Sequence, residues 1–360
     1  MNHLSAFQSA LTQKGFDAAI LSGSNSLQYL ADFVFSDGYL LITPKKAYLL
    51  TDFRYEEAAK KEANPAFEIL CPTCGIIVTM AGLLEEQGCR QVAIEEGVLS
   101  LATYESLKKR LSNTTLLSGA TEILGELTLH KDEEELDMIN RAQEITDAAF
   151  AHILGHITPT MTEVDVALEL EFFMRRSGAD GIAFNTIAVS GSASSLPHGV
   201  PRRVQLERGF LTMDFGAKLR GYRSDMTRTV VLGRADEDMK HLYQTVLRAQ
   251  KAALDAAAEG VSCQELDRIA REIIDANDRY RDRFGHSLGH GVGLNVHEAP
   301  RLARTAKPDS RLERGHVVTV EPGIYLEGKY GCRIEDMIAI MPNGTVHNFT
   351  KSPKELIELF

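Results

Sequence analysis

The chain has 360 residues, of which 44% are hydrophobic and 25% are charged, a composition typical of a soluble globular protein with room for two cores. Its net charge of −11 leaves no basic excess for phosphates, which argues against a nucleic-acid partner. No apolar run is long enough for a transmembrane helix, and the N-terminus lacks a signal-peptide core. We therefore expect a cytoplasmic protein without a membrane partner, and the odd number of cysteines, five, suits a reducing compartment.

The first part of the chain alternates between strand and helical patterns, which predicts a small α/β domain with a mixed sheet. The strand patterns occupy 17–23, 38–43, 47–52, 67–70, 91–96 and 115–119. A first helical pattern ends near residue 15, and three further helical patterns occupy 54–62, 75–87 and 100–111. We find no catalytic cluster there. The motif Cys71-Pro-Thr-Cys74 lacks a second such pair or nearby histidines, which favours two incidental thiols over a redox or zinc site.

A domain boundary is expected between Thr121 and Lys131, which gives domains at 1–122 and 131–360. The second domain opens with a long amphipathic helix whose first turn is acidic, and Thr162 with Asp165 begins another helix. Its helical segments are 131–157, 162–176, 236–258 and 262–277, and its strand segments are 184–189, 317–326, 332–341 and 345–349. Separate runs of helices and hairpins predict an α+β fold.

Two aspartates lie in a hairpin pattern over 210–231. Apolar and polar residues alternate on both sides of a turn at 218–221, where Gly221 is available for positive φ. A symmetric hairpin would place Asp214 opposite Asp225, with Cβ atoms roughly 4.5–5.5 Å apart. Two carboxylates that close repel each other unless a proton or a metal ion lies between them. The pattern is also compatible with a solvated hairpin that carries two exposed aspartates.

Three histidines follow in a glycine-rich segment, His286, His290 and His297. The glycines at 289, 291 and 293 argue against a helix and indicate close approach of the backbone to other groups. Glu321 comes where a strand ends, a place from which site residues often project.

Arg333 and Glu335 are expected on one face of the strand at 332–341, because side chains repeat every two residues. A carboxylate inside an apolar strand is costly unless it is paired. We therefore expect the Glu335 carboxylate either to pair with Arg333 or to bind a cation.

Together these segments supply four candidate carboxylates and one imidazole as metal ligands. They are Asp214, Asp225, Glu321, Glu335 and His290. Such a set suits Mn²⁺, Co²⁺ or Zn²⁺. Four negative charges fit two ions, and paired ions roughly 3.5–4 Å apart are a known device for hydrolysis.

At these residues the sequence resembles the metallopeptidase family with the pita-bread fold, which includes Xaa-Pro dipeptidases (prolidases), Xaa-Pro aminopeptidases and, more distantly, methionine aminopeptidases. The matching motifs are MDFGAKLRGYRSDMTRT, GHSLGHGVGLNVHE, TVEPGIY and RIED, in the order of the family. The resemblance implies a C-terminal pita-bread domain preceded by a creatinase-like N-terminal domain. That first domain favours the proline-directed members.

The resemblance also implies roles for single residues. Asp214 resembles the ligand of one metal ion, His290 and Glu321 resemble ligands of the other, and Asp225 and Glu335 resemble the bridging carboxylates. Histidines that contact the scissile peptide are matched by His198, in LPHG, and by His297. Supporting residues are matched by His286 and Arg333, Glu321 is also expected to move a proton, and Arg301 and Tyr325 are expected at the substrate.

The implied function is hydrolysis of Xaa-Pro bonds at the N-terminus of short peptides by a hydroxide shared between two divalent ions, with manganese favoured, in a homodimer. Arg301 favours dipeptides if it binds a free carboxylate, but it could equally be a surface arginine. Three further functions are compatible with the fold: a general aminopeptidase resembling methionine aminopeptidase, a pita-bread module that binds without catalysis, and a metal-independent hydrolase resembling creatinase. The intact ligand set argues against the last two.

Overall fold

The structure, a computed structural model, describes residues 2–360, and these divide into two compact units on either side of a boundary between residues 128 and 129. The predicted domain limits at 122 and 131 stay predictions. The helices of the first unit are α1 (His3–Gln13), α2 (Ser24–Ala31), α3 (Phe53–Glu62), α4 (Ile76–Glu86), α5 (Leu101–Lys108) and α6 (Ala120–Leu129), and the last residue of α6 is the first residue of the second unit. No helix of the described residues is long and apolar enough to span a membrane.

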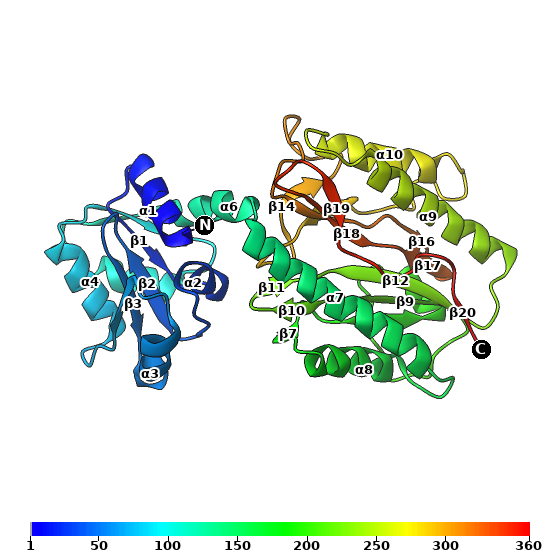
Figure 1. The fold of residues 1–360 in the computed structure, drawn as a ribbon, viewed down its shortest axis with the longest axis horizontal. Coiled ribbons are helices and arrows are strands. Elements are labelled where there is room, and N and C mark those ends of the chain that lie inside the picture. The colour runs from blue at the N-terminus through cyan, green and yellow to red at the C-terminus, as the bar shows by residue number, and fades with distance from the viewer. Residues whose placement is uncertain (1) are drawn as a thin grey trace. The chain divides into compact units, whose positions relative to one another are not determined.

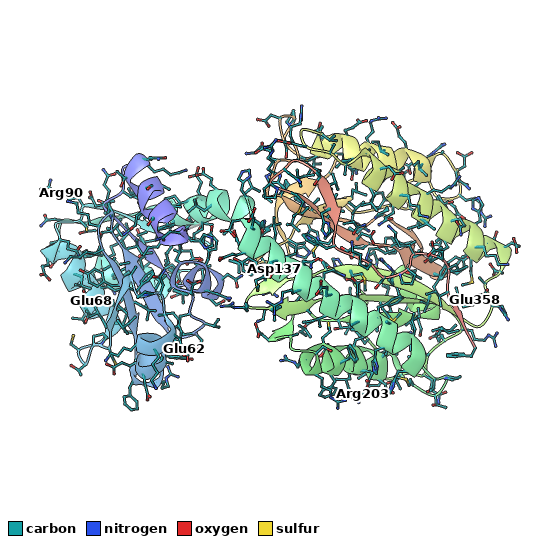
Figure 2. The ribbon with its side chains drawn as sticks, in the orientation of Figure 1. Glu62, Glu68, Arg90, Asp137, Arg203 and Glu358 are labelled. Carbon is teal, nitrogen blue, oxygen red and sulfur yellow. The ribbon has the colours of Figure 1, made fainter. Side chains whose placement is uncertain are left out.

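The described part of the first unit is built on a mixed sheet, as predicted, and its six strands have the order β4-β3-β2-β1-β5-β6. The strands are β1 (Ala18–Leu21), β2 (Gly38–Ile42), β3 (Ala47–Thr51), β4 (Phe67–Leu70), β5 (Gln91–Ile94) and β6 (Thr115–Ser118). The pairs β1–β2 and β2–β3 are antiparallel and the others are parallel. Charged side chains such as Glu62, Glu68 and Arg90 are exposed on this unit (Figure 2). Cys71 and Cys74 are free thiols.

Helices α2 and α6 were not predicted. Helix α2 begins after Gly23, which offers no side-chain cap. The carboxylate of Glu95 instead accepts hydrogen bonds from the backbone N–H groups of Ser22 and Gly23, each at 2.8 Å. A cap supplied from a distant part of the chain leaves no local signal in the sequence. Helix α6 occupies the segment in which we expected the boundary.

In the second unit, two pairs of helices enclose several small sheets (Figure 1). The helices are α7 (Glu133–His156), α8 (Glu163–Arg176), α9 (Glu237–Ala256) and α10 (Cys263–Asp275). Helices α7 and α8 pack on β8, β9 and β12, whereas α9 and α10 pack on the core beneath the C-terminal strands. Asp132 and Thr162 cap α7 and α8 in capping boxes with Glu135 and Asp165.

The sheets of this unit are small and short-stranded. Their strand orders are β11-β10-β7, β20-β12-β9-β8, β14-β13-β15-β18-β19 and β16-β17. The strands are β7 (Gly181–Ile182), β8 (Ile187–Ser190), β9 (Gly209–Phe215), β10 (Ala217–Leu219), β11 (Tyr222–Arg223), β12 (Met226–Leu232), β13 (Gly289–Gly291), β14 (Glu298–Leu302), β15 (Val317–Val320), β16 (Gly323–Leu326), β17 (Tyr330–Arg333), β18 (Asp336–Ile340), β19 (Val346–Asn348) and β20 (Glu358–Leu359).

The predicted hairpin exists, but its register was wrong. Asp214 pairs with Thr227, and Asp225 comes one residue before β12. The chain turns at Arg220 and Gly221, both with positive φ (47° and 84°), which is the two-residue turn that suits a twisted hairpin. That turn moves the pairing by two residues from the symmetric hairpin. Because side chains alternate every two residues, Asp225 still shares a face with the Thr227 opposite Asp214.

Two segments predicted to be rich in strand are divided at candidate ligands, the first of them where a strand end was predicted. The segment 317–326 divides into β15 and β16 around Glu321, as its Pro-Gly sequence indicates. The segment 332–341 was predicted as one strand, but it divides into β17 and β18, which belong to different sheets. Glu335 lies in that break, and its N–H donates to the carbonyl of Thr227 (3.1 Å). Arg333 and Glu335 are therefore not successive positions on one strand face.

Candidate metal centre

A cavity of about 1490 Å³ lies in the second unit, and every site residue predicted from the sequence except Tyr325 lines it. Its predicted lining residues are His198, Asp214, Asp225, His286, His290, His297, Arg301, Glu321, Arg333 and Glu335. Residues of α8 and of the segment 184–187, which we did not predict as site residues, form much of the remaining wall.

The candidate ligands come together in this cavity from strands β9 and β13 and from residues directly beside β12, β15 and β18. Asp225, His290 and Glu335 each offer a ligand atom, and these atoms lie within 4.8 Å of one another. The His290 Nε2 atom is 3.7 Å from Asp225 Oδ2 and 3.4 Å from Glu321 Oε1. Asp214 reaches the same cavity from β9.

Glycines allow His290 to reach this position. A Cβ atom at Gly289 would lie 1.9 Å from the carbonyl oxygen of Thr319, and one at Gly291 would lie 2.0 Å from that of Ala299. Backbone this close to its neighbours tolerates only glycine, as predicted for this segment. The His290 Nδ1–H donates to the carbonyl of Gly291 (3.0 Å), so the lone pair of Nε2 faces the cavity.

Burial and crowding of like charges raise the pKa values of the acidic groups. The pKa of Asp225 is raised by burial and then by Glu335, and the pKa of Glu335 is raised by burial and then by Glu321. Burial raises the pKa of Glu321 to about 8. Burial lowers the pKa of His290 to about 4, so its imidazole is neutral at neutral pH. Without cations, the folded chain would hold protons on these acids.

Arg333 supports the site from behind. Its Nη2 donates to Asp214 Oδ2 (2.7 Å), and its Nη1 donates to the hydroxyl of Tyr325 (2.7 Å). The Nδ1–H of His286 donates to the carbonyl of Ser287, so its Nε2 accepts from the Tyr325 hydroxyl (3.0 Å). Tyr325 was expected at the substrate. Its hydroxyl instead links Arg333 to His286, and it is not among the cavity-lining residues.

Glu335 also has a partner that sequence reasoning missed. Thr227 Oγ1 donates to Glu335 Oε2 (2.6 Å) and accepts from Arg333 Nε (2.9 Å). Thr227 lies two residues after Asp225 and is therefore expected on the same strand face, which is a sequence signal for its place at the site.

The segment that carries the histidines has a further support on α10. Asp267 Oδ1 accepts from the N–H of Leu288 (3.0 Å), and Arg271 donates to the carbonyl of His286 (2.9 Å). No local pattern indicates this long-range support.

The remaining predicted residues border the open part of the cavity. The ring of His297 lies edge-on to that of His290, with centroids 4.4 Å apart. Burial and then the nearby His198 lower the pKa of His297, which favours a neutral imidazole. Arg301 is exposed on β14, directly opposite His290 across the strand pair. Among the described residues, its guanidinium makes one long hydrogen bond, 3.5 Å, to Ser287 Oγ.

These residues fit a cluster of cations. The buried Asp214 Oδ1 atom has no hydrogen-bond partner among the described residues. The crowded carboxylates lack enough protein cations to neutralise them, and His290 offers a free lone pair. Carboxylate oxygens with one imidazole suit Mn²⁺, Co²⁺ or Zn²⁺.

Comparison with known proteins agrees with this geometry. Residues 137–342 match metallopeptidase family M24, and residues 3–126 match the Creatinase/Prolidase N-terminal domain. The chain belongs to metallopeptidase family M24, and along the sequence a creatinase-type N-terminal domain is followed by a pita-bread domain. The fold class expected from the sequence is thereby confirmed, and the family implies a dinuclear metal centre.

Three similar proteins span nearly the whole chain. The uncharacterized peptidase YqhT of Bacillus subtilis is 41% identical over 348 residues, which cover 96% of this chain and 97% of YqhT. The structure of a Xaa-Pro dipeptidase from Bacillus anthracis superimposes with a TM-score of 0.92 at 40% identity, covering 99% of both chains. An X-Pro aminopeptidase from Thermotoga maritima superimposes with a TM-score of 0.89 at 36% identity, covering 96% of this chain and 98% of that one.

Proposed function

We propose that this chain is a dinuclear metal-dependent peptidase that hydrolyses Xaa-Pro bonds at the N-terminus of short peptides. The observation that carries the proposal is the convergence of Asp214, Asp225, Glu321 and Glu335 with a neutral His290 on the floor of one cavity. The names of the similar proteins from Bacillus anthracis and Thermotoga maritima, both directed at bonds to proline, support the substrate class.

The proposed ligand roles are those that the family motifs imply for these residues. Asp214 would hold one ion, His290 and Glu321 the other, and Asp225 and Glu335 both. When bound, two such ions supply Lewis acidity and a water of lowered pKa. We favour manganese, with cobalt and zinc as the other metals to be tested.

The protein's own groups would carry the proton and the developing charge. Glu321, whose pKa burial raises, is suited to take a proton from the attacking water and deliver it to the leaving nitrogen. Neutral His297 is placed to donate to the developing oxyanion, with His198 beside it on the cavity wall. Tyr325 would position Arg333 and His286 rather than contact the substrate.

The apolar part of the cavity wall suits a bond to proline. An Xaa-Pro bond lacks an amide hydrogen, so the site needs room for the ring instead. Apolar residues of α8 and Ile187 contribute to the wall. Arg301 lines the cavity, is exposed, and makes one long hydrogen bond to Ser287. Its guanidinium would bind the free carboxylate of a dipeptide.

A second candidate within the same family is an aminopeptidase that accepts longer peptides. The observation in its favour is the size of the cavity, about 1490 Å³, which exceeds the roughly 300–1,000 Å³ common for small-ligand sites. A general aminopeptidase resembling methionine aminopeptidase is a third candidate, and a binding module without activity is the last.

Product analysis separates these candidates. The protein, purified without chelator, is incubated with Xaa-Pro, Xaa-Pro-Yaa and Met-Yaa peptides in the presence of Mn²⁺, Co²⁺ or Zn²⁺. Cleavage of Xaa-Pro alone indicates a dipeptidase, and release of Xaa from Xaa-Pro-Yaa indicates an aminopeptidase. Faster cleavage of Met-Yaa would overturn the preference for proline. No cleavage with two bound ions would favour the binding module. The cytoplasmic location and the homodimer remain predictions from the sequence.

A further inference from the structure

A second group of metal-ligating side chains lies on α7 and α8. His152 and His156 are one helical turn apart on α7, and Glu169 faces them from α8. The three potential ligand atoms lie within 4.8 Å of one another. None of the three lines the cavity that holds the candidate metal centre.

The distances in this group resemble those between ligands of one ion. His152 Nε2 is 2.7 Å from Glu169 Oε1, and His156 Nε2 is 3.6 Å from Glu169 Oε2. Metal–ligand bonds of about 2.0–2.2 Å in a tetrahedral site place neighbouring ligand atoms about 3.3–3.6 Å apart. The His156 distance reaches that range, and the shorter His152 distance is that of a hydrogen bond. An ion would thus replace the proton that now lies between His152 and Glu169, with small movements of the side chains.

The group is held in place before any ion binds. The ring of His152 is stacked against those of His156 (centroids 5.2 Å apart) and Phe173 (4.3 Å). The hydrogen bond from His152 lowers the pKa of the Glu169 carboxyl, so Glu169 is ionised at neutral pH. Two imidazoles and one carboxylate match the ligand preference of Zn²⁺, Co²⁺, Ni²⁺ and Cu²⁺ rather than of Mg²⁺ or Ca²⁺.

Solvent can reach the group. A surface hollow of about 560 Å³ is lined by His156 and Glu169, and its rim includes Leu168 and Phe172. Leu168 also lines the large cavity. An ion in this group would join α7 to the helix that forms one wall of that cavity.

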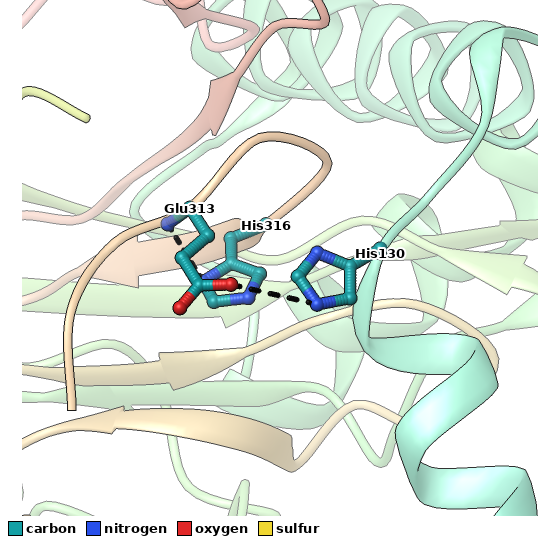
Figure 3. A group of neighbouring side chains, drawn as sticks. All are labelled: His130, Glu313 and His316. Atoms are coloured by element: carbon teal, nitrogen blue, oxygen red, sulfur yellow. Dashed lines mark hydrogen bonds and ion pairs between the residues drawn. The ribbon is translucent and has the colours of Figure 1, made fainter. Parts of the chain in front are cut away.

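A third group of the same composition, His130, Glu313 and His316, differs in one decisive respect (Figure 3). His316 Nδ1 accepts a hydrogen bond from the N–H of Glu313 (3.1 Å), so the proton of the neutral ring is on Nε2. Burial lowers the pKa of His316 to about 3, which keeps the ring neutral. Its Nε2 therefore presents a hydrogen rather than a lone pair, and this group is a natural control.

We propose that His152, His156 and Glu169 form a binding site for one borderline divalent cation such as Zn²⁺. This site is separate from the dinuclear centre, and an ion bound there holds α7 against α8. The ion would be bound by both Nε2 atoms and by the carboxylate, with water completing its coordination. The inference does not depend on the proposed peptidase activity.

The test measures zinc stoichiometry by equilibrium dialysis of the full chain across graded free Zn²⁺. The site variants are His156→Gln and Glu169→Gln, and the matched control is His130→Gln. His130 and His156 are similarly exposed, 46% and 49%, and each lies beside one glutamate and one histidine. Wild type and His130→Gln should bind one zinc ion per chain more than either site variant. Excess zinc should also raise their Tm further, and Mg²⁺ should not substitute.

Equal zinc stoichiometry in wild type and both site variants would overturn the proposal, and so would an equal loss in His130→Gln. The Tm of each metal-free variant is measured first. If His156→Gln is not folded, Glu169→Gln alone decides the outcome. Peptidase activity is not part of the readout. If the wild type is inactive but the site variants bind one zinc ion fewer than it does, only the proposed function is contradicted.

Discussion

Glu335 and Asp336 are neighbours in the chain, and both are buried, but they face different surroundings. Asp336 Oδ1 accepts from Arg228 (2.9 Å), and its Oδ2 accepts from Lys354 (2.6 Å). The Glu335 carboxylate accepts from the neutral hydroxyl of Thr227 and faces other carboxylates. Thr227 and Arg228 are themselves successive residues of β12, so their side chains point to opposite faces of that strand.

The pKa values of the two acids move in opposite directions for this reason. Arg228 and Lys354 outweigh burial and lower the pKa of Asp336, whereas burial and Glu321 raise the pKa of Glu335. Strand alternation thus gives one face a completed ion-pair network and leaves the other face short of cations. A buried acid whose charge the protein itself neutralises is structural, and one left without cations marks a site for an external ion.

The largest expected effect separates these two faces by activity. Glu335→Gln and Asp225→Asn should each abolish peptidase activity and reduce bound metal, because an amide cannot replace a carboxylate shared by two ions. The metal-free variants should be at least as stable as the metal-free wild type, since an amide is neutral without the proton that each buried acid must take up on folding. Metal analysis, turnover and urea unfolding check this. A variant with two ions and normal turnover would contradict the assignment.

Asp336→Asn should have the converse effect. It leaves Arg228 and Lys354 without their buried counter-charge, and loss of one partner of a buried pair typically costs about 3–5 kcal/mol. The free energy of unfolding should fall by that amount, while the metal content of the folded protein is kept. Glu335→Gln, one residue away, is the matched control for urea unfolding. Equal stability losses in both variants would remove the contrast between the faces.

The contrast also predicts how pH acts on the metal-free protein. The folded-state pKa of Glu321 is about 8, above the usual value of 4.5, so the folded chain holds a proton that the unfolded chain has lost. Between these values Glu321 therefore makes the free energy of unfolding fall as pH rises, and this one group contributes at most about 1.4 kcal/mol per pH unit. Urea unfolding at about pH 7 and about pH 8 measures it, above the range in which the buried histidines titrate.

Metal-loaded wild type and metal-free Glu321→Gln serve as the two controls for that measurement. Cations replace the proton in the first, and the second lacks the titrating carboxyl, so both should lose less stability over this interval. The same fall in all three proteins would show that another group is responsible.

The fold and most of the site could be predicted because their signals are local. Glu321 precedes a Pro-Gly turn, and the glycines around His290 indicated close backbone contacts, which the structure has at Gly289 and Gly291. The hairpin register could not be predicted, because positive φ at Arg220 has no signal as strong as that of a glycine.

The supports of the site were missed for a different reason. Thr227 meets Glu335 across 108 residues, and Asp267 meets Leu288 across 21 residues. Only the folded chain brings such partners together. The ion pair of Asp336 with Arg228 was missed for the same reason, since 108 residues separate them.

His297→Ala tests a residue on the cavity wall that is not a proposed ligand. Loss of one oxyanion donor typically lowers kcat by about 10²–10³-fold. Because His297 is not a proposed ligand and its ring lies edge-on to that of His290, the variant should keep its two metal ions. Steady-state kinetics and metal analysis check both parts. A variant that loses metal would make His297 a ligand or an essential support of His290.

The smallest expected effect concerns Arg301, which lies opposite His290 but is exposed on the rim of the cavity. If it binds the free carboxylate of a dipeptide, the charged hydrogen bonds contribute roughly 1.5–3 kcal/mol. Arg301→Ala should then lower kcat/KM for Ala-Pro by about 10–100-fold. Ala-Pro-Ala carries its carboxylate one residue further out, so its kcat/KM should fall much less.

Two further variants sharpen this test of substrate length. Arg301→Lys should rescue Ala-Pro cleavage only in part, because an ammonium group lacks the planar fork that binds both carboxylate oxygens. Arg304→Ala is the matched control, since Arg304 is also exposed but does not line the cavity. Equal losses on Ala-Pro and Ala-Pro-Ala, or none on either, would leave Arg301 without a role in selecting dipeptides. In that case the size of the cavity would favour the aminopeptidase, because the cavity has room for a third residue and Arg301 would not select against it.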